Sequence, residues 1–314
     1  MPARRAAEHG IAGHGLTSAH RILHLSDVHL TGTGRDEDGV DAAAALDRIL
    51  HDARFVEGID VVLVSGDVAD DGSMAGYAAA VQRVGRFAQG RGIPQVYCPG
   101  NHDDRAAFAQ VLGTGHLDAA GRDVGRLAGP DGERAAVSEV SGLRVITLDS
   151  LVPGHVHGLI SGAQLAWLGE QLADPAPAGS VVALHHPPIA VASIPWTAST
   201  GLHNAAALGE VLAGSDVRAV LCGHFHAQIV GRLSGVPVSV TPGVVTRMDL
   251  TAPPTLWRGV QGAGATVVDL GPDGPTFHTL QARDPQAGTP VYLVDAETMA
   301  DVADETAAYD TGGR

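Results

Sequence analysis

The sequence predicts an α/β protein in which two β-sheets pack together and are flanked by helices. From residue 21 to about residue 212, short β-branched runs alternate with segments of helical spacing, a pattern typical of a largely parallel sheet. After Cys222 the apolar runs at 236–240, 266–270 and 276–280 are separated by Gly/Pro turns and no strong helical pattern, which indicates antiparallel strands. The two patterns together favour two sheets over a single one.

Four helices are expected between the strands of the first part. Ser161 with Gln164 forms a capping box before a third helix, and Asn204 is expected to cap a fourth. The Gly/Pro-rich stretch 251–264 is expected to be a long loop. The first two helices are predicted from apolar spacing at Leu46, Ile49 and Leu50, and at Tyr77, Val81, Val84 and Ala88.

Length and composition limit the domain organisation and the partners. The chain has 314 residues and a formal net charge of −15, which disfavours a nucleic-acid partner. Residues 1–20 are expected to be a flexible leader, 21–283 the catalytic domain, and 284–314 an acidic tail or interface arm. No stretch resembles a secretory signal or an integral membrane span, so a cytoplasmic location is expected. Apolar Ile194, Trp196 and Trp257 are expected either to cover the site or to form a homodimer contact.

The basic residues and cysteines exclude several kinds of chemistry. All 20 basic residues are arginine, so a P-loop lysine, a kinase lysine and a Schiff base are ruled out. Cys98 and Cys222 are too few for a disulfide framework, and we expect them to be buried strand residues rather than metal ligands.

Five apolar runs end in polar residues of the kind that bind metals. Ligands bind at the carboxyl ends of strands in open α/β sheets, so these ends are expected to converge. The motifs are Asp27-Val28-His29, Gly66-Asp67, Gly100-Asn101-His102-Asp103, His185-His186 and Gly223-His224-Phe225-His226.

Each motif alone also has a structural explanation. Asp27 with His29 is typical of a solvated turn, Asp67 could cap the helix that begins near Ser73, and Asn101 could supply a left-handed turn. A His-x-His pair lies in a core or on a surface about as often as on a metal. The recurrence of five such motifs favours a common site.

The donor types indicate two metal ions. Asp27 and His29 lie two positions apart, as do His224 and His226, so each pair is expected to face one side if strand geometry continues. Asp67 would be costly to bury unpaired, and sharing between two ions would resolve that cost. Mixed imidazole and oxygen donors suit Zn, Fe or Mn, and ions about 3.5–4 Å apart are typical of phosphoryl displacement.

We expect the remaining polar residues to have other roles. His102 is expected to face the substrate, with Asp103 orienting its ring. Adjacent strand residues point to opposite faces, so we favour His185 over His186 as the ligand. His155 and His157 are interpreted as groups on the substrate side or the surface.

The five motifs, in this order over residues 21–282, resemble those of calcineurin-like metallophosphoesterases. The segment 183–188 and the loop 154–158 resemble bacterial class III cyclic-nucleotide phosphodiesterases. The resemblance implies a four-layer αββα sandwich of two mixed sheets, and a role for His102 near the phosphate. Asp103 stands where family members have Glu. The implied ligands are Asp27, His29, Asp67 and His226 for one metal, and Asp67, Asn101, His185 and His224 for the second.

We therefore expect a dinuclear-metal phosphodiesterase that converts 3′,5′-cyclic AMP to 5′-AMP by attack of a metal-bound hydroxide. The same chemistry on a glycerophosphodiester, a 2′,3′-cyclic nucleotide or a phosphomonoester is the nearest alternative. A non-catalytic scaffold of the same fold is the alternative from another class.

Overall fold

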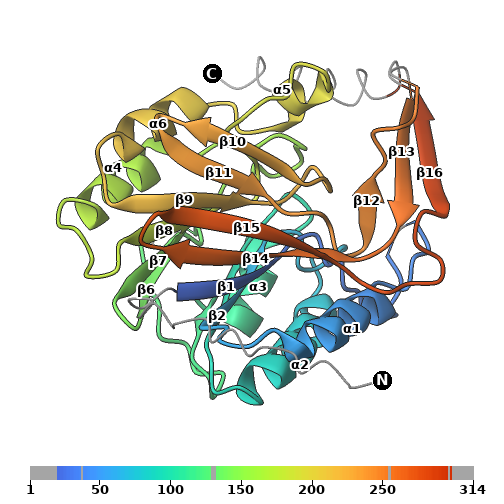
Figure 1. Cartoon of the computed structure of the whole chain (residues 1–314), viewed down its shortest axis with the longest axis horizontal. Coiled ribbons are helices and arrows are strands. Elements are labelled where there is room, and N and C mark those ends of the chain that lie inside the picture. The colour runs from blue at the N-terminus through green and yellow to red at the C-terminus, as the bar shows by residue number, and fades with distance from the viewer. Residues whose placement is uncertain (1–19, 37, 129–131, 254–255, 296–297, 299–314) are drawn as a thin grey trace, which may run out of the picture.

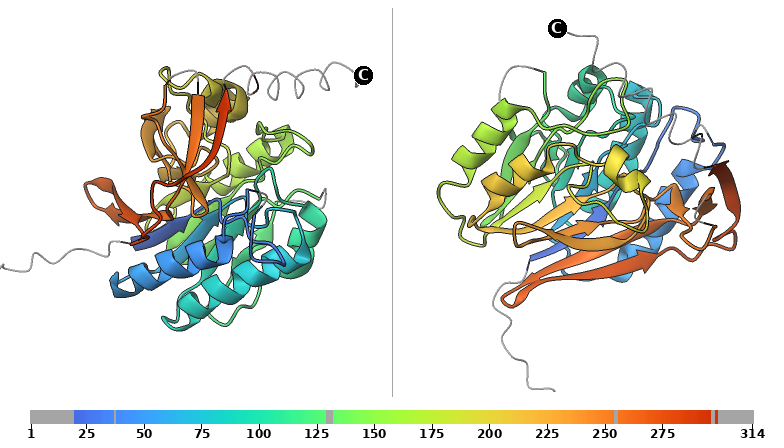
Figure 2. Two further views of the ribbon diagram at one scale, coloured as in Figure 1. Left: turned by 90° about the vertical axis from the view of Figure 1, so that its right-hand side faces the viewer. Right: turned by 90° about the horizontal axis from the view of Figure 1, so that it is seen from above.

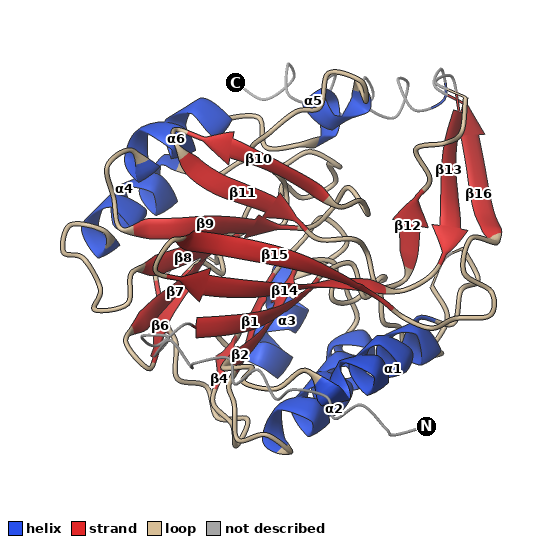
Figure 3. Cartoon of the chain, viewed as in Figure 1, coloured by secondary structure: helices blue, strands red, loops and turns tan. Residues whose placement is uncertain are grey.

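The computed structural model describes residues 20–36, 38–128, 132–253, 256–295 and 298. Two mixed sheets pack face to face, with helices on both outer sides, which confirms the predicted four layers (Figures 1 and 3). The expected leader is outside the described residues except for His20, which begins the first strand. Residues 299–314 of the expected tail are outside them as well.

The first sheet has the strand order β15-β14-β1-β2-β3-β4. β1, β2 and β3 are parallel, whereas β14 is antiparallel to both β1 and β15. Its strands are β1 (His20–Leu25), β2 (Val61–Ser65), β3 (Gln95–Cys98), β4 (His116–Leu117), β14 (Gly264–Gly271) and β15 (Gly274–Gln281).

The second sheet has the order β10-β11-β9-β8-β7-β6-β5. The run at 236–240 was expected to be antiparallel, but β11 lies parallel to β9 and antiparallel only to β10. Its strands are β5 (Arg126–Leu127), β6 (Ala136–Val140), β7 (Leu143–Thr147), β8 (Ser180–Ala183), β9 (Val217–Cys222), β10 (Ile229–Leu233) and β11 (Val236–Val240).

Three apolar cores hold the layers together. The middle core joins the facing sheets through residues such as Leu63 and Val181. One outer core packs α1 (Ala42–Asp52), α2 (Met74–Gln89) and α3 (Arg105–Leu112) on the first sheet, and the left view of Figure 2 shows the blue and cyan helices together on that side. The other packs α4 (Gly162–Gln171) and α6 (Ala205–Leu212) on the second sheet. Among the described helices none has both the length and the apolar character needed to cross a bilayer.

The helix starts agree only partly with the predicted caps. Ser161 Oγ accepts from Gln164 N as expected, but the Gln164 side chain bonds both the N–H and the C=O of Asp149 instead of closing the box. Asn204 precedes α6, yet its side chain bonds the backbone of Ile160. In both cases the amide ties the helix to another segment, which spacing within one helix does not reveal.

A third, three-stranded sheet was not predicted. It consists of β12 (Thr246–Met248), β13 (Leu256–Gln261) and β16 (Pro290–Asp295), in the order β12-β13-β16 (Figure 1). The stretch 251–264, expected to be a loop, therefore contains β13 and the start of β14. The boundary expected at residue 284 stays a prediction, although β16 within the expected tail pairs with β13.

Candidate metal centre

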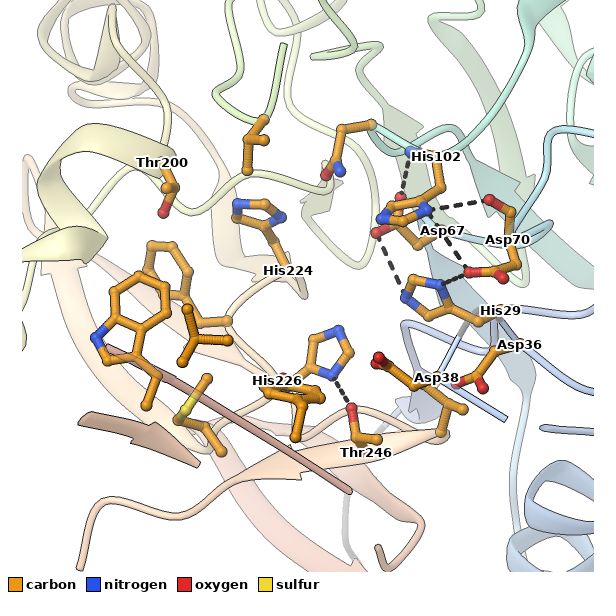
Figure 4. A pocket seen from close by; sticks show the side chains of 18 of the residues that line it. His29, Asp36, Asp38, Asp67, Asp70, His102, Thr200, His224, His226 and Thr246 are labelled. Carbon is orange, nitrogen blue, oxygen red and sulfur yellow. Dashed lines mark hydrogen bonds and ion pairs between the residues drawn. The ribbon is translucent and has the colours of Figure 1, made fainter. Parts of the chain in front are cut away.

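Four of the five motifs line one cavity of about 340 Å³, at the edge where β1, β2, β3 and β9 end, and the fifth, which follows β8, contacts them through His185. Figure 4 shows Asp67, His102, His224 and His226 around this cavity. Asp27 and His185 lie just behind its wall and are fully buried. Segments that are far apart in sequence are thus assembled by the parallel order of the central strands.

One cluster of donor atoms comes from Asp27, His29 and His226. Nε2 of His226 lies 3.3 Å from Oδ1 of Asp27. One donor atom from each of the three residues lies within 4.8 Å of the others. This spacing is close enough for one ion to bind all three after small adjustments of the side chains.

Asp67 lies between this cluster and a second set of donors. Its Oδ2 is 3.6 Å from Nε2 of His29 on one side and 3.1 Å from Nε2 of His185 on the other. The Asn101 Oδ1 lies 3.2 Å from the same nitrogen of His185, and the His224 ring centroid is 5.0 Å from that of His185. The structure therefore brings together all seven predicted ligand residues, with the Asp67 carboxylate between the two sets.

The ligands are aimed by left-handed backbone rather than by strand alternation. Asp27, His29, Asp67, His224 and His226 have φ of 54°, 44°, 47°, 68° and 48°. Such values are uncommon for residues other than glycine and cluster at functional sites. Asp27 and His29 converge as predicted, whereas His224 and His226 both line the cavity but belong to different donor clusters. The assumed cause was wrong, because β1 and β9 end before these turns.

Two glycines allow the close approach of these turns. A Cβ on Gly66, whose φ is 91°, would lie 2.3 Å from Nδ1 of His185. A Cβ on Gly223 would overlap the Ser26 hydroxyl. Glycine is therefore required at these two motif positions, because a side chain there would collide with a neighbouring segment of the site.

The buried donors fit metal ions. Nε2 of His29 is buried without a hydrogen-bond partner, while its Nδ1 lies 2.7 Å from Asp70 Oδ1. Burial opposes the charge on His185, but Asp67 and Asp27 outweigh it and raise its pKa to about 9. Burial likewise opposes ionisation of Asp27, but His226 lowers the pKa of that carboxyl to about 2. The buried carboxylates and imidazoles thus stabilise one another's charged forms, and Nε2 of His29 has no hydrogen-bond partner, so this donor set suits a bound cation.

His102 is paired differently from the expectation. Its Nδ1 lies 3.0 Å from the Asp70 carbonyl oxygen and 3.6 Å from Asp70 Oδ1. Both oxygens of Asp103 instead accept backbone N–H groups, from Gly100, Val68 and Ala69. Asp103 therefore fixes the turn that carries Asn101 and His102, and the carboxylate that faces His102 belongs to Asp70.

The family model for calcineurin-like phosphoesterases matches residues 20–228. The chain belongs to the calcineurin-like phosphoesterase family. A cAMP/cGMP dual specificity phosphodiesterase of Mycobacterium tuberculosis is 41% identical over 86% of this chain and 80% of its own length.

Two further relatives of this phosphoesterase are more distant. The 3′,5′-cyclic adenosine monophosphate phosphodiesterase CpdA of Escherichia coli K12 is 30% identical over 71% of this chain and 75% of its own. The glycerophosphodiester phosphodiesterase GpdQ of Enterobacter lignolyticus is 29% identical over 71% and 77%.

Two further histidines of the phosphoesterase that the sequence had singled out, His186 and His157, are both buried. His186 is fully buried, and its two ring nitrogens contact Ser150 Oγ and the Val156 carbonyl at 2.8 and 3.1 Å. It lies near His185 and His224 as part of one cluster of donor atoms, but both nitrogens already have partners. His157 is buried and stacks on His203 with ring centroids 3.8 Å apart, so it is a packed residue rather than a surface group. Cys98 and Cys222 are buried free thiols, as predicted.

Sequence reasoning missed two residues that hold ligands in place. Asp70 contacts His29 and His102, and the signal for it was a second carboxylate three positions after Asp67. Thr246 Oγ1 lies 2.7 Å from Nδ1 of His226 and also bonds Tyr292. The Thr246 contact depends on the third sheet, so no local motif could have indicated it.

Proposed function

We propose that this phosphoesterase hydrolyses 3′,5′-cyclic nucleotides with two metal ions bound in the cavity. The observation that carries the proposal is the position of Asp67 between two sets of nitrogen and oxygen donors. Asp27, His29, Asp67 and His226 would hold one ion. Asp67, Asn101, His185 and His224 would hold the other. Mixed imidazole and carboxylate donors favour Fe, Mn or Zn.

Bound ions would supply a nucleophile near neutral pH by lowering the pKa of water, together with Lewis-acid stabilisation of the phosphate. The protein's own contribution begins with His102, whose side chain is 27% exposed at the cavity. Since the Asp70 carbonyl can only accept, Nδ1 of His102 carries a proton, and Nε2 would be the ring nitrogen that exchanges a proton with substrate. For cyclic AMP, the doubly protonated form of His102 would give its Nε2 proton to the O3′ leaving oxygen, which yields 5′-AMP and leaves His102 neutral with its proton on Nδ1.

The substrate assignment is supported by relatives that are named as cyclic-nucleotide phosphodiesterases, among them those of Mycobacterium tuberculosis and Escherichia coli. A small phosphodiester also matches a cavity of about 340 Å³. The absence of nucleic acid among the partners, the cytoplasmic location and the homodimer stay predictions.

The proposal is tested by metal analysis and a substrate panel. We expect about two ions per chain after reconstitution with Mn, Fe or Zn, and the highest kcat/KM on 3′,5′-cyclic nucleotides. Asp67→Ala should lose both ions and turnover together. Full activity with unchanged metal content in this variant would disprove the shared role of Asp67.

A glycerophosphodiester is the second candidate substrate, favoured by the similarity to GpdQ. A higher kcat/KM on glycerophosphodiesters than on cyclic nucleotides would select it. A protein that stays metal-free and inactive under all three reconstitutions would instead support the scaffold hypothesis.

A further inference from the structure

The cavity has two chemically different sides. Figure 4 shows Thr200 on one side and Asp36, Asp38 and Asp70 on the other. Thr200 belongs to α5 (Trp196–Thr200), and this helix also contributes Trp196 to the cavity lining. One side therefore offers aromatic surface, whereas the other presents carboxylates that repel a phosphate.

A continuous series of ring contacts leads from the ligands to this aromatic side. The ring centroids of His224 and Phe225 are 5.5 Å apart, those of Phe225 and Trp196 5.2 Å, and those of Trp196 and Trp257 4.3 Å. Trp257 comes from β13 of the third sheet and also lines the cavity. Three separate segments thus place aromatic rings next to each other, beginning at a ligand of the second metal position.

We propose that Trp196 and Trp257 form the subsite that binds the base of a nucleotide substrate. This inference rests on the proposed function, which puts the phosphate at the donors and leaves the base to occupy one of the two sides. Bases stack on aromatic side chains regardless of their edge groups. The side lined by carboxylates is unfavourable for an apolar ring system, so the base is expected to bind on the aromatic side.

The polar groups on the aromatic side of the cavity indicate that the protein discriminates only weakly between adenine and guanine. Thr200 Oγ1 donates to the Trp196 carbonyl at 3.0 Å, so its hydrogen is already used. Stacking without edge recognition should accept adenine and guanine alike, and should favour purines over the smaller pyrimidines. Cyclic AMP and cyclic GMP are therefore expected to have similar KM values, with a higher KM for cyclic CMP.

The chain provides a matched control for a tryptophan substitution. Of its three tryptophans, Trp167 lies on α4 and packs half-buried against an outer core. It is not among the residues that line the cavity. Substitution of Trp167 should therefore affect stability without affecting recognition of the base.

The kinetic test compares Trp257→Leu, Trp257→Phe and Trp167→Leu in the metal-loaded protein. Substrates are cyclic AMP and a base-free analogue, methyl ribofuranoside 3′,5′-cyclic phosphate. We expect Trp257→Leu to raise KM for cyclic AMP about tenfold to a hundredfold with little change in kcat, and to leave the analogue unaffected. Trp257→Phe keeps a stacking face and should restore most of the affinity, and Trp167→Leu should behave as wild type.

A binding measurement separates stacking from general packing. In a Trp167→Phe background, 5′-AMP should quench the fluorescence of the remaining tryptophans, whereas ribose 5-phosphate should not. Equal losses on cyclic AMP and the base-free analogue, or equal quenching by both ligands, would overturn the subsite. An effect of Trp257→Leu confined to glycerophosphocholine would assign the rings to a choline group instead. A wild-type protein that hydrolyses only other phosphodiesters would overturn the proposed function itself, which is a different outcome.

Discussion

Oδ1 of Asp70 lies 2.7 Å from Nδ1 of His29, and the carbonyl oxygen of the same aspartate lies 3.0 Å from Nδ1 of His102. One residue therefore orients both a predicted metal ligand and the group proposed to move a proton. With its Nδ1 held by a carboxylate, His29 presents Nε2 to the metal position in a fixed tautomer. Asp70 is thus a positioning residue for two functions.

The variant Asp70→Asn removes this negative charge while keeping the shape of the side chain. We expect metal affinity to fall about tenfold to a hundredfold, because outer partners of ligating histidines contribute that much. A metal titration monitored by calorimetry measures this loss of metal affinity. Asp71→Asn is the matched control, since Asp71 is exposed and bonds only the backbone N–H of Ser73 among the contacts described. Equal losses in the two variants would contradict the role of Asp70.

The strand-end motifs were predictable because parallel order itself brings them together. β1, β2 and β3 are adjacent in one sheet, so Asp27, Asp67 and Asn101 lie at one edge of it, and β8 and β9 are adjacent in the other, so His185 and His224 lie at one edge of that sheet. Local sequence suffices for this step, because each motif directly follows its own strand. The packing of the two sheets through the middle core then brings the two edges together.

Other features depend on contacts that local patterns do not encode. Asp103 and Asp70 are both acidic neighbours of the motifs, and only the fold of the turn decides that Asp103 accepts backbone N–H groups while Asp70 faces the rings. β13 is short and lies in a Gly/Pro-rich stretch, and one of its two partner strands, β16, comes about thirty residues later. Its apolar residues therefore looked like loop residues in the sequence.

Thr246 gives a second prediction about ligand positioning. Its Oγ1 lies 2.7 Å from Nδ1 of His226, and Thr246 is buried. Thr246→Val keeps the shape but leaves this nitrogen without its partner, so we expect metal affinity to fall about tenfold to a hundredfold. Thr246→Ser retains the hydroxyl and should keep near-normal affinity in the same titration. The prediction fails if the valine and serine variants bind metal equally well.

His102→Ala should separate metal binding from proton transfer. Because His102 contributes no predicted metal contact, the variant should keep its metal content while kcat falls about a hundredfold on a poor leaving group. The loss should be much smaller on a p-nitrophenyl phosphodiester, whose leaving group needs no proton. The comparison requires steady-state rates on both substrates and metal analysis of the same sample. Equal losses on both would exclude proton donation by His102.

His116 links stability to pH at a distance from the cavity. It is fully buried on β4, and its ring nitrogens contact Ser138 Oγ at 2.7 Å and Thr147 Oγ1 at 2.9 Å. Burial lowers its pKa from 6.5 to about 3, although Asp123 opposes the shift. Between these two values the unfolded chain binds a proton that the folded protein does not. The contribution of a neutral His116 is therefore fully present above pH 6.5 and is lost as the pH falls towards 3.

Replacing His116 with Gln should remove this part of the acid sensitivity. From pH 7 to pH 5, we expect the free energy of unfolding to fall by about 2 kcal/mol more in the wild type than in His116→Gln. Urea unfolding of both proteins at the two pH values measures these falls in the free energy of unfolding. The contributions of the other buried histidines, such as His24, cancel between the proteins because both contain them. The variant is expected to be less stable at pH 7, since glutamine cannot replace both ring contacts, but that offset does not enter the comparison. If the free energy of unfolding fell equally in the two proteins, His116 would accept a proton in the folded state. Its burial between the hydroxyls of β6 and β7 would then not keep it neutral.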